Sequence, residues 1–233
     1  MRRDCRRLEL GGVWRENTYP GCACDVPSAL YSYSFAPNPA WSRIFAGQAE
    51  IKNYLQSTAE KAGVLSHVRF QHEAQRAGWS DADDCWIIQT NQGEFRSRFA
   101  IMACGPMHEP VLPIVPGLES FSGDIFHSSR WRHDIDLRGK RVAVIGTGAS
   151  AIQFVPKIQP LVSQLSVFQR TPHWVLPKMD QTLPPLVQRL FKRLPLAQLT
   201  VRGAIFGIFE TLNGGMQNIA AMKQFQRLAL FNL

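Results

Sequence analysis

The residues best suited to binding a cofactor lie in segment 142–151, which reads VAVIGTGASA. An apolar run typical of a buried strand leads into Gly146 and Gly148, and a stretch with helical spacing follows. The first glycine permits a tight turn, the second lets the backbone approach a pyrophosphate, and the small Ala151 permits close packing of helix on strand. The N–H groups at the start of the helix attract phosphate. The predicted cofactor contacts are Gly146, Thr147, Gly148, Ala149, Ser150, Ala151 and Gln153. The alternative is a tight strand-to-helix turn that binds no ligand.

Charge decides which dinucleotide this turn favours. A site for NAD usually places Asp or Glu after the second strand, where the carboxylate holds the ribose 2′-hydroxyl. This chain has no acidic residue between Asp136 and Asp180, and Arg170 and Thr171 follow the second predicted strand. A guanidinium can form a forked pair with a 2′-phosphate, and a hydroxyl can add a hydrogen bond. The sequence therefore favours NADP, and a solvated arginine at a strand end is the alternative.

A strand–helix–strand unit must position these residues. Segments 141–145 and 165–169 have the apolar pattern of buried parallel strands, and 149–159 has helical spacing between them. A proline-punctuated crossing at 106–117 precedes this unit and is predicted to link two modules. The segment 184–233 is mostly helical in pattern.

The upstream third of the chain is predicted to contain a helix and a small antiparallel sheet. Apolar residues fall at helical spacing over 48–62, and Gly63 ends that helix. Three strand-like runs follow, at 68–77, 86–90 and 94–103. The last two runs are separated by Asn-Gln-Gly, which is typical of a hairpin.

Several motifs in this order resemble a known family. Segment 121–131, FSGDIFHSSRW, fits F-x-G-x-x-x-H-x-x-x-W, which resembles the fingerprint of Baeyer–Villiger monooxygenases within the class B flavin-dependent monooxygenases. The family pattern usually continues with Pro or Asp, whereas Arg132 follows here. The other stretches that resemble the family are 11–14, 19–21, 24–25, 31–35, 103–105 and 168–172. Together they cover roughly residues 11–178, and an ordered set is more specific than any single motif.

The resemblance implies a fold, two cofactors and an activity. The fold would be α/β, with a Rossmann-like NADP domain, part of an FAD-binding domain and C-terminal helices. NADPH would reduce FAD, and the reduced flavin would react with O2 to give a C4a-peroxyflavin that oxygenates a ketone or a soft heteroatom. Asp25 matches the family's active-site aspartate, and the alternative is an Asp that caps its own turn. The residues that match flavin-lining positions are Gly12, Val13, Trp14 and Tyr31, with Asp25 near both cofactors. His127 would belong to the linker between the dinucleotide domains, and a structural histidine is an equal alternative.

The same resemblance indicates that parts of the family pattern are missing. The family opens with a strand and a G-x-G-x-x-G turn for the FAD pyrophosphate, and this chain has neither. We therefore expect a chain truncated at both ends and inactive by itself. The expected domains are a partial FAD-binding domain at 1–120, an NADP-binding unit at 121–180 and a truncated helical segment at 181–233. The alternatives are a non-enzymatic NADP-binding remnant and a relative of the pyridine nucleotide–disulfide reductases, which need a redox cysteine pair.

Composition indicates which partners and which cellular compartment to expect. The 233 residues carry a formal net charge of +8, but no Lys/Arg block is interleaved with aromatics, so we do not expect nucleic-acid binding. The five cysteines include no CxxC pair and no zinc-like spacing, which favours a reducing compartment without a metal site. Neither a secretory signal nor a transmembrane run is evident, and we expect a cytoplasmic protein. The substrate and the oligomeric state are left open.

Overall fold

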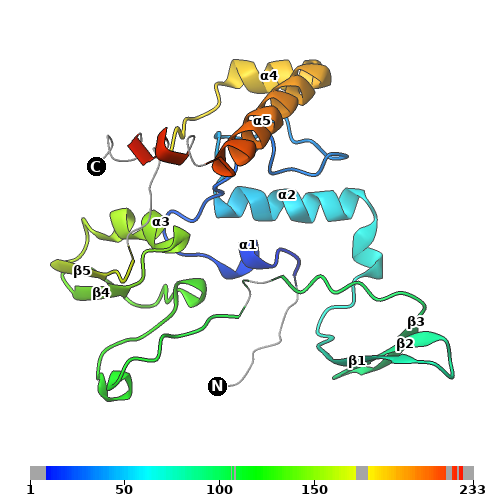
Figure 1. Cartoon of the computed structure of the whole chain (residues 1–233), viewed down its shortest axis with the longest axis horizontal. Coiled ribbons are helices and arrows are strands. Elements are labelled where there is room, and N and C mark those ends of the chain that lie inside the picture. The colour runs from blue at the N-terminus through cyan, green and yellow to red at the C-terminus, as the bar shows by residue number, and fades with distance from the viewer. Residues whose placement is uncertain are drawn as a thin grey trace.

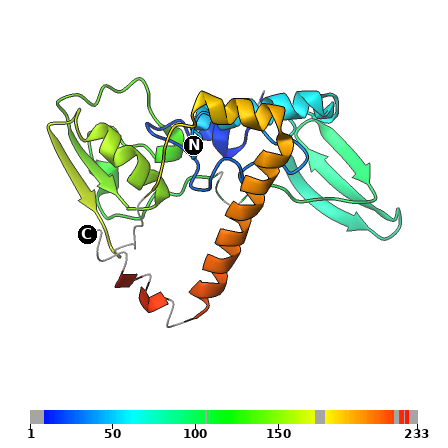
Figure 2. The same cartoon turned by 90° about the horizontal axis from the view of Figure 1, so that it is seen from above.

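The described residues form two β-sheets and five α-helices. The structure is a computed structural model that describes residues 9–105, 107, 109–171, 178–218, 222–224 and 226–227. Predictions that concern the remaining positions, including 172–177 and the last six residues, lie outside the described residues. The elements in chain order are α1 (Val13–Glu16), α2 (Gln48–Lys61), β1 (Ala74–Ser80), β2 (Cys85–Thr90), β3 (Gly93–Ser97), β4 (Arg141–Ile145), α3 (Ala149–Ile158), β5 (Gln164–Phe168), α4 (Pro185–Arg193) and α5 (Pro195–Met216). The β4–α3–β5 unit and the β1–β3 sheet lie at opposite ends of the molecule, with α1 and α2 between them (Figure 1 and Figure 2).

The predicted strand–helix–strand unit is confirmed. β4 and β5 pair in parallel from Arg141 opposite Gln164 to Ile145 opposite Phe168, and α3 connects them. The bounds of β4 are as predicted, the end of α3 differs by one residue, and β5 lies one residue earlier than predicted. One face of α3 is buried because its apolar residues recur at helical spacing. The core of this unit consists of Val144, Ala151, Phe154 and Ile158, together with Tyr19 from the upstream loop.

The predicted helix at 48–62 is also confirmed, as α2. Its buried side chains are Ile51, Tyr54 and Thr58, and Gly63 ends it in a left-handed conformation with φ of 68°. Ile51 and Tyr54 pack with Trp41, which is 2% exposed. This second core holds the loop that precedes α2, so the loop is ordered without regular secondary structure.

The antiparallel sheet has the predicted order, but both ends of β1 and the end of β3 were predicted wrongly. β1 covers Ala74–Ser80 instead of 68–77, and Gln71, whose φ is 60°, interrupts the extended backbone before it. β3 ends at Ser97 instead of 103. β2 begins at Cys85, one residue beyond the last pair of Trp86 with Ser97, so residues 99–103 have no partner in β2. The hairpin between β2 and β3 is confirmed.

The helical prediction for 184–233 is confirmed over α4 and α5. Each helix has a proline in its first turn, Pro185 and Pro195, where the missing N–H is tolerated. Arg43 and Asp180 form a salt bridge of 3.0 Å that ties the segment before α4 to the loop before α2. In the part of the chain that the structure describes, none of the helices combines the length and the apolar character that a bilayer crossing requires.

Candidate dinucleotide site

The glycine turn has the geometry that the motif predicts. Gly146 has φ of 106°, which a residue with a side chain rarely adopts, and its N–H donates to the Phe168 carbonyl at 2.9 Å. Gly148 immediately precedes α3, and a Cβ added there would meet no atom within 4 Å. Ala151 is buried against the core. The turn therefore leaves open space beside the N-terminus of α3, where a phosphate-bearing ligand can approach.

Arg170 and Thr171 lie beside this turn. The bond between Gly146 and the last residue of β5, Phe168, holds the two strand ends together, and Arg170 and Thr171 follow after Gln169. Both residues are exposed, and Gln169 Nε2 donates to the Thr171 carbonyl at 3.2 Å. In open α/β sheets, ligands bind outside the carboxyl ends of the strands, which is where these residues lie.

The residues predicted to line a flavin come from two separate loops that meet. Trp14 Nε1 donates to the Tyr31 hydroxyl at 2.9 Å, and their rings contact edge to face. Gly12, with φ of 52°, precedes the single turn of α1, which contains Val13. Gln48 Nε2 also contacts the Trp14 carbonyl, so α2 holds this corner in place.

The loop containing Asp25 is seated directly on α3. A Cβ added at Gly21 would lie 2.8 Å from the Gln153 carbonyl oxygen, and Gly21 has φ of 80°, so only glycine fits there. Gln153 Oε1 accepts from the Ala23 N–H at 3.2 Å and from the Tyr19 hydroxyl at 3.1 Å. Gln153 Nε2 donates to the Ala23 carbonyl at 3.0 Å and to Asp25 Oδ1 at 2.9 Å. One amide thus joins the predicted dinucleotide helix to the predicted catalytic carboxylate.

Lys178 is a neighbour of Asp25 that sequence reasoning missed. Its Nζ lies 4.0 Å from Asp25 Oδ1, donates to the Cys24 carbonyl at 2.9 Å and lies 4.7 Å from the centre of the Phe45 ring. The Asp25 side chain is 63% exposed, so its carboxylate faces open space between these groups. No local pattern could have paired residues this far apart in the chain.

Burial keeps the other titratable groups of this loop protonated. It raises the pKa of Tyr19 to about 12, although a hydrogen bond with Ser150 opposes the shift. It also raises the pKa of the Cys22 and Cys24 thiols, and both cysteines are free. These thiols are therefore poor nucleophiles near neutral pH.

The fingerprint residues His127 and Trp131 have structural partners. His127 Nδ1 accepts from the Ser129 N–H at 3.1 Å and caps the short 3-10 helix Ser128–Arg130. Burial lowers the pKa of His127, and the nearby Arg130 lowers it further. The Trp131 ring packs on Phe154 of α3 with 5.2 Å between ring centres. Trp131 thus packs on the helix that follows the glycine turn, whereas His127 caps the short helix that precedes Trp131.

These features together form a strand–glycine turn–helix unit with the Asp25 loop packed on it, and the comparison with known families agrees with the family resemblance. Residues 10–198 match the family described as "Flavin-binding monooxygenase-like", and the chain belongs to this family. It is 50% identical over 205 residues to a Baeyer-Villiger monooxygenase of Streptomyces coelicolor strain A3(2), a match that covers 88% of this chain and 40% of that protein. The resemblance stated from the sequence motifs is therefore confirmed.

Solved structures give the same result at the level of the fold. An oxidized steroid monooxygenase bound to NADP superposes with a TM-score of 0.72 and 39% identity, over 80% of this chain and 37% of that one. The monooxygenase OTEMO in complex with FAD and NADP superposes with a TM-score of 0.71 and 33% identity. This match covers 79% of this chain and 38% of that one. The α/β fold of the two-dinucleotide-binding flavoproteins is thereby confirmed. The chain spans about two fifths of the length of the relatives that it matches.

Proposed function

We propose that the protein is an FAD- and NADPH-dependent monooxygenase that transfers one oxygen atom of O2 to a ketone or to a soft heteroatom. The observation that carries this proposal is the 2.9 Å hydrogen bond from Gln153 on α3 to Asp25 on the flavin-side loop. Through this bond, the Gln153 side chain links the residues that are suited to bind a nicotinamide dinucleotide to those that are suited to bind a flavin. A hydride donor and a flavin must meet in such an arrangement.

The residues around the glycine turn fit NADP. Gly146 makes the turn, and the open space at Gly148 leaves room for a pyrophosphate at the start of α3. Arg170 and Thr171 follow β5 on the exposed side of the turn, where they would bind the 2′-phosphate. With no carboxylate between Asp136 and Asp180, nothing in this stretch would repel that phosphate.

The loops at 11–35 fit one side of a flavin. We propose that Gly12, Val13, Trp14 and Tyr31 line it, and that FAD supplies the activation of O2 when bound. Asp25 would act as a fixed negative charge between the two cofactors. Gln153 donates to its carboxylate and the Lys178 ammonium lies near it, so these two groups would orient the carboxylate.

The preference for the phosphorylated nucleotide provides the test. We expect the chain to bind NADP+ more tightly than NAD+, and Arg170→Ala to weaken NADP+ binding by about ten- to hundredfold because a charge-assisted hydrogen bond is lost. Binding of NAD+ should change little. The measurement is isothermal titration with both nucleotides, followed by O2 consumption with NADPH and NADH in the full-length protein.

Arg189→Ala serves as the matched control, because Arg189 is an exposed arginine on α4, away from β5. This variant should bind both nucleotides as the unmodified chain does. If Arg170→Ala leaves the preference between NADP+ and NAD+ unaltered, or if the full-length protein binds neither nucleotide, the proposed function is wrong.

A further inference from the structure

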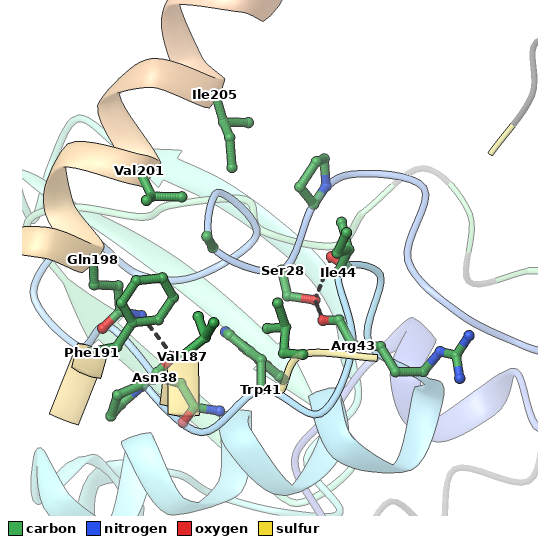
Figure 3. Close-up of a pocket in the computed structure, with 14 residues that line it drawn as sticks. Ser28, Asn38, Trp41, Arg43, Ile44, Val187, Phe191, Gln198, Val201 and Ile205 are labelled. Carbon is green, nitrogen blue, oxygen red and sulfur yellow. Dashed lines mark hydrogen bonds between the residues drawn. The ribbon is translucent and has the colours of Figure 1, made fainter. Parts of the chain in front are cut away.

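A second ligand-sized space lies away from the dinucleotide turn, between the loop before α2 and the helices α4 and α5. Its volume is about 320 Å³ (Figure 3). Residues of the loop at 27–44 form one wall. Leu183 and residues of α4 and α5 form the other. Its lining residues include Ser28, Trp41, Arg43, Val187, Gln198 and Ile205.

Polar contacts at its edges hold this cavity open. Gln188 Nε2 donates to the Trp41 carbonyl at 3.1 Å, and Gln198 Nε2 donates to the Asn38 carbonyl at 2.7 Å. Arg202 Nη1 donates to three carbonyls of the loop, those of Ala29, Leu30 and Ser32. Because these bonds fix the distance between α5 and the loop, the apolar side chains between them cannot close the gap without breaking a buried polar contact.

The walls favour an uncharged and mostly apolar occupant. Val187 and Ile205 project from the two helices toward Trp41 on the opposite side (Figure 3). The Ser28 hydroxyl is already engaged with the carbonyls of Arg43 and Ile44 and with the Ala46 N–H. The Arg43 guanidinium is paired with Asp180. Water in such a space would find few partners, whereas an apolar molecule would lose little on entering it.

Gln198 supplies one polar recognition point. Its residue is 3% exposed, and because the Asn38 carbonyl can only accept, the amide nitrogen faces Asn38 and Oε1 faces the other way. Among the described residues no donor to this oxygen is found. The oxygen is not fully buried, and Gln198 lines the cavity. Because the described residues supply no donor to this oxygen, a ligand hydroxyl that donates to it would add a hydrogen bond that the protein does not make itself.

We propose that this cavity binds an uncharged alicyclic or aromatic alcohol whose hydroxyl donates to Gln198 Oε1. An apolar cavity of ~150 Å³ takes benzene, so the 320 Å³ here admits a molecule larger than one six-membered ring. The site is separate from the dinucleotide turn and does not depend on the proposed monooxygenase activity.

Borneol, a bicyclic alcohol, and camphor, the corresponding ketone, are suitable probes. We expect borneol to bind the 233-residue chain more tightly than camphor, by about five- to tenfold for one hydrogen bond. Gln198→Leu should abolish this difference. The bonds of Gln188 and Arg202 to the loop remain in this variant, so the cavity stays open and apolar binding is retained. Ligand-observed NMR titration measures both affinities, and NADP+ added at saturation should not displace borneol.

Variants that fill the cavity test its location. Val187→Phe and, independently, Ile205→Phe should each weaken borneol binding by about tenfold or more. Leu186→Phe on the exposed side of α4 is the matched control and should have no effect. Far-UV circular dichroism and thermal unfolding show that each variant is folded. Absence of borneol binding, unchanged affinity in both filled variants, or displacement by NADP+ would overturn the proposal.

Discussion

At the scale of single residues, side chains that the motifs single out have structural tasks as well as candidate chemical ones. Gln153 was predicted to contact a cofactor, and its amide also joins Tyr19, Ala23 and Asp25 to α3. His127 belongs to the family fingerprint, and its imidazole caps a short helix. Motif residues can therefore stabilise the structure around a candidate site through hydrogen bonds of their own.

The cap at His127 makes stability depend on pH. Burial lowers the pKa of His127 in the folded protein, so the folded state favours the neutral ring. The stability from this residue is present above the unfolded pKa of about 6.5 and is lost as pH falls through the lower, folded pKa. We expect the free energy of unfolding to decrease on acidification, and His127→Asn, which retains an acceptor, to reduce that decrease. Urea unfolding from pH 7.5 to 5 measures it.

His67 provides the control, because it is exposed in a short helical turn. His67→Asn should leave the pH dependence as it is. Identical pH dependence in His127→Asn and the unmodified chain would show that the cap contributes nothing.

At the scale of elements, α5 is held to the rest of the molecule chiefly by polar contacts at one end. Arg202 donates to three loop carbonyls, whereas Phe206, Ile208 and Phe209 farther along the helix are exposed. We expect Arg202→Ala to lower the free energy of unfolding by about 2–3 kcal/mol, because hydrogen bonds from a charged group are lost and the carbonyls lose their donor. Urea unfolding measures the change.

The comparison variant for this prediction is Arg193→Ala, at the exposed end of α4. It should alter stability by less than about 0.5 kcal/mol, as surface substitutions usually do. Equal effects of the two substitutions would mean that Arg202 does not anchor α5.

At the scale of the whole molecule, the segment between the two sheets presents an apolar surface. Residues 98–117 contain no helix or strand among the positions described, and Ile101 and Ile114 are 90% and 102% exposed. Contiguous exposed apolar surface promotes association. We expect the triple substitution of Ile101, Val111 and Ile114 by Lys to slow aggregation, measured by light scattering at rising concentration, without lowering the melting temperature.

Added charge alone could also slow aggregation, so the control introduces the same three lysines elsewhere. Suitable positions are Gln92, Gln181 and Gln217, which are already polar and exposed. If this control slows aggregation as much as the apolar replacements do, net charge and not the apolar surface is responsible.

The sequence by itself determined the strand–glycine turn–helix unit, the helix α2, the hairpin and the family. Each of these depends on residues close together in the chain, whose spacing and conformational preferences are visible without a structure. The ends of β1 and β3 were predicted wrongly, because strand length is set by the partner strand and not by local pattern.

Only the tertiary structure decided which distant groups meet. The bond of Gln153 to Asp25 spans 128 positions. The contact of Lys178 with the Cys24 carbonyl and the cavity that Gln198 lines likewise join segments far apart in sequence. Side-chain hydrogen bonds of this kind form after the elements have packed, and they leave no periodic signal in the chain. The motifs therefore named the candidate residues, whereas packing brought them together.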